Sequence, residues 1–347
     1  MKELAAELRK YKQVYVVCDR NVEDFARKVA GLRTGARTAQ RGTDGPLSRI
    51  DNLLPITADE GHKTIDTVMD ICRWLCDCGA DRDALVLAVG GGVTTDMAGF
   101  AASIYKRGIL YANIPTTLLS MVDAGIGGKT GVNLDGYKNL LGVIRQPEFT
   151  AIFPEALETL PERELRSGLA EMLKTFIIKN PRNAYERTVD LFNDGARASV
   201  ADGNLPELIQ LAAGIKQEIV EKDEFESGPR RKLNLGHTWA HAIEWWQKEA
   251  GRKEQFTHGE AVAIGIVQAA RFAEKIGIAE EPGLADRIAT DLKACGLPTE
   301  LPCPAEELLP AILKDKKAYG SKIKLVLPCR IGKVAVKAVP SESIAEA

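Results

Sequence analysis

The stretch LVLAVGGGVTTD, residues 85–96, decides the fold. Its first five residues are an uninterrupted apolar run, which is typical of a strand buried on both faces of a parallel sheet. Three glycines follow at once, and a helix is predicted from about Thr94 to Tyr105. A strand, a glycine-rich loop and a helix in this order predict one βα unit of a parallel sheet.

The glycine triplet at residues 90–92 also indicates a ligand. Glycine lets the backbone approach a ligand closely, and a helix N-terminus offers free N–H groups to phosphate oxygens. Three glycines exceed what a tight turn needs, so a nucleotide or phosphate site is favoured. The spacing is not that of the Gly-x-Gly-x-x-Gly fingerprint. Asp96 can cap the helix or contact the ligand, and its position alone does not separate the two roles.

Outward from this unit, the first half of the chain alternates strands and helices. Short β-rich runs lie at residues 14–18 and 110–114, and residues 64–78 have a helical pattern. From Pro154 onward the apolar residues recur mainly with the 3.6-residue period of helices. We therefore expect an α/β domain with a parallel sheet over residues 1–153 and an all-α domain over residues 154–347. A cleft between two domains is the usual place for a ligand.

Composition narrows the class of protein. The length of 347 residues is typical of about two domains, and the net charge of −2 argues against a general nucleic-acid or membrane-surface binder. No apolar run approaches the ~18 residues of a membrane-spanning helix, and the N-terminus lacks the apolar core of a signal peptide. Seven mostly scattered cysteines favour reduced thiols in a cytoplasmic protein over a metal site.

Histidine is scarce and clustered. The chain has four histidines, and three of them are His237, His241 and His258. Imidazole is the commonest metal ligand, and zinc accepts two imidazoles and one carboxylate while leaving a fourth position for substrate. Since residues four apart share a helix face, both His237 and His241 are candidate ligands. Glu171 is a candidate carboxylate, although with Lys174 it forms what is more often an exposed ion pair.

Several cations and polar groups accompany this cluster. Lys129 lies in GIGGKTGVN, which lacks the spacing of a phosphate-binding Walker loop. Lys216 falls within the apolar stripe of a predicted helix, where a lysine needs an anionic partner or must reach water. Arg230 and the pair Lys316-Lys317 add further positive charge. This excess of cations indicates an anionic substrate that carries a phosphate, a carboxylate or both.

Together these segments resemble the 3-dehydroquinate synthase family of sugar-phosphate cyclases, from about Asp19 to Lys317. The strongest parts are residues 90–99, 115–139, 159–174 and 223–244. The resemblance implies a Rossmann-like NAD-binding domain, an α-helical metal- and substrate-binding domain, and a homodimer. The implied enzyme is a carbon–oxygen lyase of the shikimate pathway, which leads to the aromatic amino acids. It would convert 3-deoxy-D-arabino-heptulosonate 7-phosphate to 3-dehydroquinate and phosphate.

The implied reaction uses NAD and one divalent metal, zinc or cobalt, both of which suit the donor set. It proceeds by transient oxidation, phosphate elimination, reduction and intramolecular aldol closure.

The resemblance also implies a role for individual residues. The metal ligands fall on Glu171, His237 and His258, so His241 becomes a substrate contact. The NAD contacts fall on Asp19, Glu60, Lys63, Gly91, Gly92, Val93, Asp96, Thr116, Thr117, Lys138 and Thr159. The substrate and catalytic residues fall on Asp123, Lys129, Asn139, Lys174, Lys216, Arg230, Asn234 and His241, with one of Lys316 and Lys317. Arg107 corresponds to an arginine that reaches the partner subunit's site.

The chain departs from the family pattern at a few positions. Thr95 replaces a common glycine, Gly125 a frequent serine and Thr175 a frequent tyrosine. The segment from His241 to His258 is a few residues longer than usual. None of these changes removes a proposed ligand or cation.

Three alternatives stay open at this point: another sugar-phosphate cyclase, a metal-dependent alcohol dehydrogenase of similar two-domain plan, and a non-catalytic NAD-sensing module. Lys138-Asn139, Arg230 and His241 favour the dehydroquinate reaction, because its substrate carries a carboxylate. The metal set and the cations argue against the sensing module.

Overall fold

Strand β3 (Leu85–Gly90) lies inside a four-stranded parallel sheet, as its apolar run predicts. The sheet order is β2-β1-β3-β4, with β1 at Val14–Asp19, β2 at Leu53–Ile56 and β4 at Leu110–Pro115. The computed structural model describes residues 1–34, 52–135, 137–252, 255–314 and 322–344. By its contacts the chain divides into two compact units, Met1–Leu157 and Glu158–Ala347, and each is described by itself.

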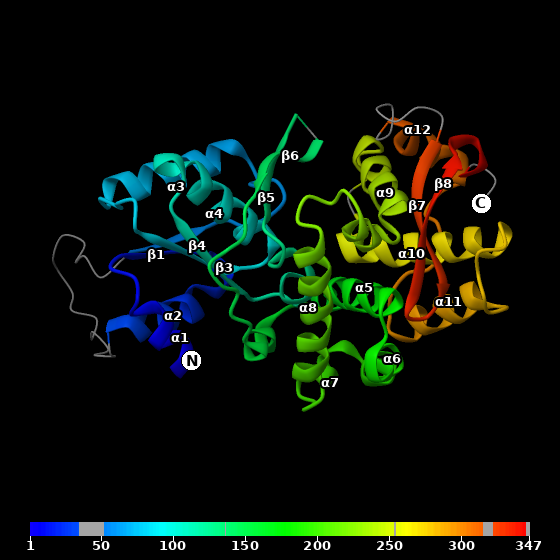
Figure 1. Cartoon of the computed structure of the whole chain (residues 1–347), viewed down its shortest axis with the longest axis horizontal. Coiled ribbons are helices and arrows are strands. Elements are labelled where there is room, and N and C mark those ends of the chain that lie inside the picture. The colour runs from blue at the N-terminus through cyan, green and yellow to red at the C-terminus, as the bar shows by residue number, and fades with distance from the viewer. Residues whose placement is uncertain (35–51, 136, 253–254, 315–321, 345–347) are drawn as a thin grey trace. The chain divides into compact units, whose positions relative to one another are not determined.

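Helices cover both faces of the sheet in the first unit. Helices α3 (Ile65–Asp77) and α4 (Gly92–Ile104) lie on one face, and α1 (Lys2–Leu8) and α2 (Glu23–Thr34) lie on the other (Figure 1). Val86 and Ala88 pack with α3 and α4, whereas Leu85, Leu87 and Val89 pack with α1 and α2. Because both faces of β3 are buried, every position of the strand is apolar or glycine.

The first unit also contains a hairpin that the sequence pattern did not indicate. Strands β5 (Lys129–Leu134) and β6 (Tyr137–Ile144) pair antiparallel. At Gly131, in the glycine-rich segment, an added Cβ would lie 2.5 Å from the carbonyl oxygen of Leu141. At Gly142 it would lie 2.1 Å from the carbonyl oxygen of Thr130, so only glycine fits at either position. The glycine-rich segment after Asp123 is therefore built for close strand pairing as well as for a turn.

The second unit is largely helical, as predicted. Its helices are α5 (Glu162–Ile178), α6 (Ala184–Asn193), α7 (Ala196–Val200), α8 (Leu205–Lys222), α9 (His237–Glu249), α10 (His258–Lys275), α11 (Leu284–Ala294) and α12 (Ala305–Lys314). Most residues of α5 and α10 are buried, which places these two helices at the centre of the unit. The prediction of an all-α domain missed an antiparallel hairpin, β7 (Lys322–Arg330) and β8 (Lys333–Pro340), of which β7 packs against α10.

Candidate active site

Three helices of the second unit bring a carboxylate and two imidazoles together. Glu171 lies in α5, His237 is the first residue of α9 and His258 is the first residue of α10. Glu171 Oε1 lies 3.2 Å from His258 Nε2 and 3.7 Å from His237 Nε2. Among the described residues, these three form the one group of His, Cys, Asp and Glu side chains close enough to share a metal ion.

Glycines allow these helices to approach closely. A Cβ on Gly259 would lie 1.9 Å from the carbonyl oxygen of Ser167 in α5. A Cβ on Gly265 would lie 2.0 Å from the carbonyl oxygen of Gly236. Gly236 precedes α9 with a φ of +80°, a left-handed conformation that favours glycine. The ligand-bearing ends of α9 and α10 are thus placed by backbone contacts that no larger residue permits.

The arrangement fits a divalent ion. Two donor atoms about 2.1 Å from one tetrahedral ion lie about 3.4 Å apart, which matches the two measured separations. Both oxygens of Glu171 are buried, and among the described residues neither has a hydrogen bond of acceptable geometry. A buried carboxylate that lacks hydrogen bonds is a suitable ligand for a cation, and Oε2 of Glu171 already pairs with one cation, the ammonium group of Lys174.

Lys174 lies beside this group and changes its electrostatics. Its Nζ forms an ion pair with Glu171 Oε2, and both side chains are at most 1% exposed. Burial alone would raise the pKa of Glu171, but Lys174 and the two histidines hold it well below its usual range. The interpretation of Glu171 and Lys174 as an exposed surface pair is therefore wrong, because α5 is buried on nearly all sides.

The two imidazoles have opposite charge preferences. Burial, together with the positive charge of Lys174, lowers the pKa of His237 to about 3. Burial also lowers the pKa of His258, but Glu244 and Glu171 outweigh it and raise the value to about 10. Nδ1 of His237 lies 3.1 Å from Leu235 O, and Nδ1 of His258 lies 3.0 Å from Glu244 Oε1. Such contacts leave Nε2 of each ring available to a metal.

Other substrate candidates of the second unit surround the loop before α9. Lys216 and Arg230 are 7% and 2% exposed, so both side chains are buried. Asn234 Nδ2 donates to Glu226 Oε1 at 2.5 Å. The exposed ring of His241 stacks edge-on against His237, with centroids 5.5 Å apart.

Sequence reasoning missed three carboxylates that support these residues. Glu226 accepts from Asn234, Glu244 contacts His258, and Asp223 Oδ2 accepts from the backbone N–H of Arg230 at 3.0 Å. Glu244 follows His237 by seven residues and His241 by three, so helical spacing places it on the same face of α9. That spacing is the signal that could have identified it. Asp223 and Glu226 lie in irregular backbone and gave no such signal.

In the first unit, several of the proposed NAD contacts lie at the carboxyl ends of the parallel strands. Asp19 ends β1, Gly90 ends β3, and Thr116 follows β4 and donates its N–H to Gly90 O at 2.9 Å. The sheet order reverses between β1 and β3, and ligands of open α/β sheets bind at such a switch point. Burial raises the pKa of Asp19, although its contact with Asn21 partly opposes the shift.

The glycine triplet serves packing as well as ligand approach. Helix α4 begins at Gly92, and a Cβ on this residue would lie 2.8 Å from Cβ of Ala124. A Cβ on Gly90 would lie 2.4 Å from Oγ1 of Thr94. Thr95 is a departure from the family pattern. Its Oγ1 donates a hydrogen bond to Gly92 O at 3.0 Å, so the side chain lies along the first turn of α4. The free N–H groups at the start of α4 remain suited to phosphate.

One ammonium group joins residues assigned to NAD and to substrate. Lys63 Nζ lies 2.5 Å from Asp96 Oδ2 and 2.5 Å from Asn139 Oδ1, and Lys63 is 5% exposed. Asn133, which the sequence reasoning missed, accepts from the backbone N–H of Asn139 at 2.9 Å and donates to Glu60 Oε1 at 2.8 Å. The first unit thereby gathers Glu60, Lys63, Asp96 and Asn139 in one network.

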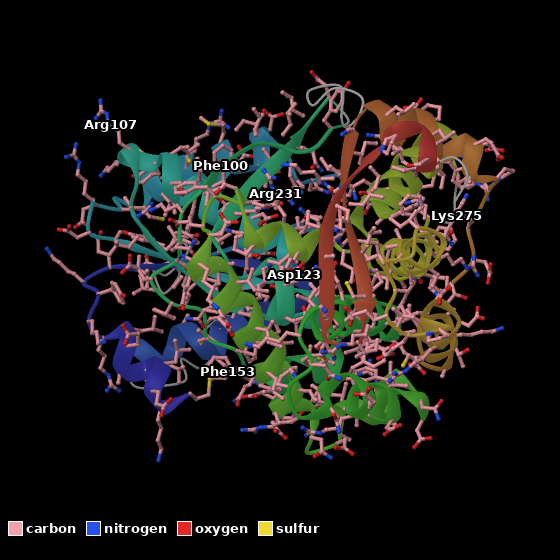
Figure 2. The ribbon with its side chains drawn as sticks, turned by 45° about the vertical axis from the view of Figure 1, so that its right-hand side comes forward. Phe100, Arg107, Asp123, Phe153, Arg231 and Lys275 are labelled. Carbon is pink, nitrogen blue, oxygen red and sulfur yellow. The ribbon has the colours of Figure 1, made fainter. Side chains whose placement is uncertain are left out.

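The remaining candidates are placed as follows. Asp123 lies in the short helical turn η3 (Ser120–Ala124). Thr117 follows β4, and its hydroxyl oxygen accepts a hydrogen bond from the backbone N–H of Ser120. Lys129 and Lys138 are exposed on the β5–β6 hairpin. Arg107 is exposed in a turn with a φ of +69° and points away from the ribbon (Figure 2). Gly91 and Val93 flank the start of α4, and Thr159 ends the turn η4 (Pro154–Thr159) in the second unit. Lys316 and Lys317 lie outside the described residues.

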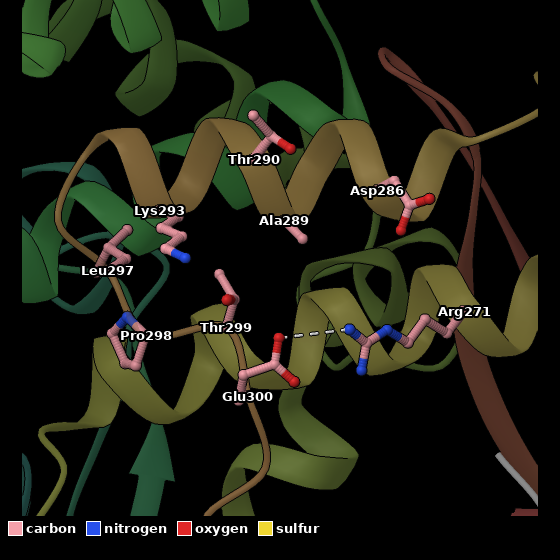
Figure 3. A pocket seen from close by; sticks show the side chains of 9 residues that line it. All are labelled: Arg271, Asp286, Ala289, Thr290, Lys293, Leu297, Pro298, Thr299 and Glu300. Atoms are coloured by element: carbon pink, nitrogen blue, oxygen red, sulfur yellow. Dashed lines mark ion pairs between the residues drawn. The ribbon is translucent and has the colours of Figure 1, made fainter.

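A separate cavity of about 540 Å³ lies between α10 and α11. Arg271 and Glu300 form an ion pair across part of it at 3.6 Å, and Lys293 and Asp286 add one charge of each sign (Figure 3). None of the proposed ligand, cofactor or substrate residues that the structure describes lines this cavity, so we do not include it in the candidate site. No helix in the described part of the chain has both the length and the apolar character needed to cross a bilayer.

Comparison with known proteins gives one consistent result. A family model described as 3-dehydroquinate synthase N-terminal matches residues 53–167, and one described as 3-dehydroquinate synthase C-terminal matches residues 168–318. A 3-dehydroquinate synthase of Dictyoglomus thermophilum is 41% identical over 296 residues, which cover 82% of this chain and 78% of that protein. One from Acidithiobacillus ferrooxidans is 40% identical over 335 residues, which cover 96% of this chain and 87% of that protein.

Solved structures of sugar-phosphate cyclases have the same fold. A 2-epi-5-epi-valiolone synthase from Streptomyces hygroscopicus, with NAD+ and Zn2+ bound, has a TM-score of 0.82 at 29% identity and covers 99% of this chain and 92% of that one. A 2-deoxy-scyllo-inosose synthase complexed with carbaglucose-6-phosphate, NAD+ and Co2+ has a TM-score of 0.82 at 25% identity. The match covers 99% of this chain and 93% of that one. These likenesses confirm the predicted fold class.

Proposed function

The chain belongs to the 3-dehydroquinate synthase family, and we propose that it converts 3-deoxy-D-arabino-heptulosonate 7-phosphate to 3-dehydroquinate and phosphate as a carbon–oxygen lyase. The observation that carries this proposal is the group of buried Glu171 and partly exposed His237 and His258, with buried Lys174 beside it. The cofactors are NAD and one divalent metal, zinc or cobalt. The structural relatives that bind NAD+ with Zn2+ or Co2+ support both.

We assign NAD binding to residues 1–153 and metal and substrate binding to residues 154–347. Glu171, His237 and His258 would hold the metal, and the start of α4 with Asp96 and the strand ends would hold NAD. When bound, NAD accepts a hydride and returns it, and the metal lowers the pKa of the substrate hydroxyl that is oxidised. NAD is therefore not consumed in the overall reaction.

The buried cations of the second unit have a clear task in this reaction. Lys174, Lys216 and Arg230 would bind the phosphate and the carboxylate of the substrate, and their burial strengthens each interaction. Holding both anionic ends fixes the sugar so that elimination and ring closure proceed as intramolecular steps. Asn234 and His241 would orient the hydroxyl groups.

Two further assignments complete the proposal. The exposed Arg107, held in a left-handed turn, supports a homodimer in which it reaches the partner subunit's site. The seven cysteines are all free thiols, which is typical of the reducing cytoplasm. Among the sugar-phosphate cyclases, the dehydroquinate reaction is favoured over the other family products, because the relatives named for it are about 40% identical and the other two cyclases 29% and 25%.

A phosphate-release assay tests the function. The purified protein, supplied with NAD and zinc or cobalt, should release phosphate from the heptulosonate phosphate without accumulating NADH, and a chelator should stop the reaction. Net formation of NADH would indicate an alcohol dehydrogenase instead. Equal turnover of a heptulose phosphate that lacks the carboxylate would indicate another sugar-phosphate cyclase.

A further inference from the structure

Two side chains of α9 hold the chain around His258 without belonging to the proposed ligand set. Glu244, 8% exposed, places Oε1 at 3.0 Å from His258 Nδ1. Gln247, 5% exposed, bonds twice to the backbone of Phe256, two residues before His258. The N–H of Phe256 donates to Gln247 Oε1 at 2.8 Å, and Gln247 Nε2 donates to Phe256 O at 3.1 Å.

His258 needs such support because of where it stands in the chain. It is the first residue of α10 and follows the segment that connects α9 to α10. A capping box of Thr257 and Glu260 fixes the start of the helix, but it does not fix the rotation of the His258 ring. A hydrogen bond from the second ring nitrogen to a carboxylate sets both the tautomer and the ring orientation of a metal-bound histidine.

The geometry gives each carboxylate around His258 a separate role. Nε2 of the ring faces Glu171 Oε1 at 3.2 Å, whereas Nδ1 faces Glu244 on the other side. Glu244 is outside the group of side chains whose ligand atoms can share one ion. It therefore acts on the metal only through the imidazole.

We propose that Glu244 and Gln247 are positioning residues for the metal site: Glu244 fixes the ring of His258, and Gln247 fixes the backbone that precedes it. The inference rests on the proposed ligand set. A neighbouring contact on the same helix provides the matched control. Trp246 Nε1 donates to Glu307 Oε2 at 2.8 Å, which is a carboxylate contact of similar length that does not touch His258.

Zinc affinity of the full-length protein tests the proposal. The metal-free protein and its variants are titrated with zinc against a chromophoric chelator, and the unfolding temperature of each metal-free variant is recorded. Glu244→Leu should weaken zinc binding about 10- to 100-fold, as other supporting carboxylates do. Glu244→Gln, which keeps an acceptor, should weaken it less, and Gln247→Leu should also weaken it. Glu307→Leu should change the unfolding temperature but not the zinc affinity.

Three outcomes would contradict the proposal, and each has a different meaning. Zinc affinities of the Glu244 variants equal to that of Glu307→Leu would show that Glu244 is only structural. The absorption spectrum of bound cobalt reports how many ligands the metal has. If this number differed between Glu244→Gln and the unmodified protein, Glu244 would itself be a ligand. Absence of zinc binding by the unmodified protein would overturn the ligand set, and the positioning roles with it. Because Glu244→Gln preserves size and shape, it keeps the test valid if Glu244→Leu fails to fold.

Discussion

The two units prepare their ligand sites in different ways. The first uses backbone: glycines at the end of β3, the start of α4 and the ends of parallel strands. The second uses buried charged side chains, of which Glu171, Lys174 and Arg230 are at most 2% exposed. A site built from backbone groups lowers the stability of the empty protein little, whereas buried charges lower it strongly unless they are paired. The second unit should therefore respond far more strongly to the loss of a single side chain.

The largest effect is expected at a metal ligand. His237→Ala should lower turnover about a thousandfold, because a metal contributes several kcal/mol to the reaction and each 1.4 kcal/mol is a factor of ten. Steady-state phosphate release measures this change. The fourth histidine, His62, is exposed and pairs with Asp59 in the first unit, so His62→Ala is the control and should keep full activity. Comparable losses in both variants would refute the assignment.

The next effect concerns the buried charge beside the metal. Lys174→Met should destabilise the metal-free protein by about 3 kcal/mol, because it leaves Glu171 buried without its main positive partner. Urea unfolding measures the loss, and added zinc should recover part of it by binding the carboxylate. The control is Lys179→Met, which breaks an exposed pair with Glu218 and should cost far less stability, because water screens the pair. A similar loss in the two variants would remove the distinction between buried and surface pairs.

A backbone change tests the first unit. Gly92→Ala should destabilise the protein by about 1–3 kcal/mol, because its Cβ would crowd Ala124, and it should weaken NAD binding while leaving zinc affinity unchanged. Calorimetric titration with each ligand separates the two effects. Gly214, in α8, has open space around its missing Cβ, and Gly214→Ala should leave both affinities unchanged. Unaltered NAD affinity in Gly92→Ala would argue against a role for the glycine loop in cofactor binding.

The last effect, about tenfold for each pH unit, is a dependence of metal affinity on pH. Since the pKa of His258 is raised to about 10, the metal-free imidazole carries a proton at neutral pH, and zinc must displace it. His237, with a pKa lowered to about 3, is already neutral and adds no dependence. Zinc affinity should therefore rise about tenfold per pH unit below about pH 10. Competition titrations at several pH values measure the slope, and a flat profile would show that His258 is neutral before zinc binds.

The difference between the units also explains what the sequence could predict. The β3–α4 unit was correctly predicted because its signals are local: an apolar run, a glycine triplet and a helical pattern within twenty residues. The hairpins β5–β6 and β7–β8 were missed. Glycine interrupts the alternation in β5 and β6, whereas β7 begins with a clear alternation of lysine and apolar residues that was not recognised. The resemblance to the dehydroquinate synthase family is confirmed by comparison, which the residue pattern alone could not provide.

The metal group shows where sequence reasoning fails for a physical reason. Glu171 and Lys174 flank an apolar stripe, and a helix with one buried face would leave them exposed. Helix α5 is buried on nearly all sides, and this burial depends on the packing of α6, α7, α8 and α10 around it. Spacing also could not choose between His237 and His241, because both lie on one face of α9. The choice depends on α5 and α10, which are distant in sequence.

The most direct test is the position of the metal. Crystals of the protein grown with zinc, measured with X-rays near the zinc absorption edge, should show an anomalous peak bounded by Glu171, His237 Nε2 and His258 Nε2. A peak at another site, such as the thiols of α3, or no peak at these three side chains, would contradict the account.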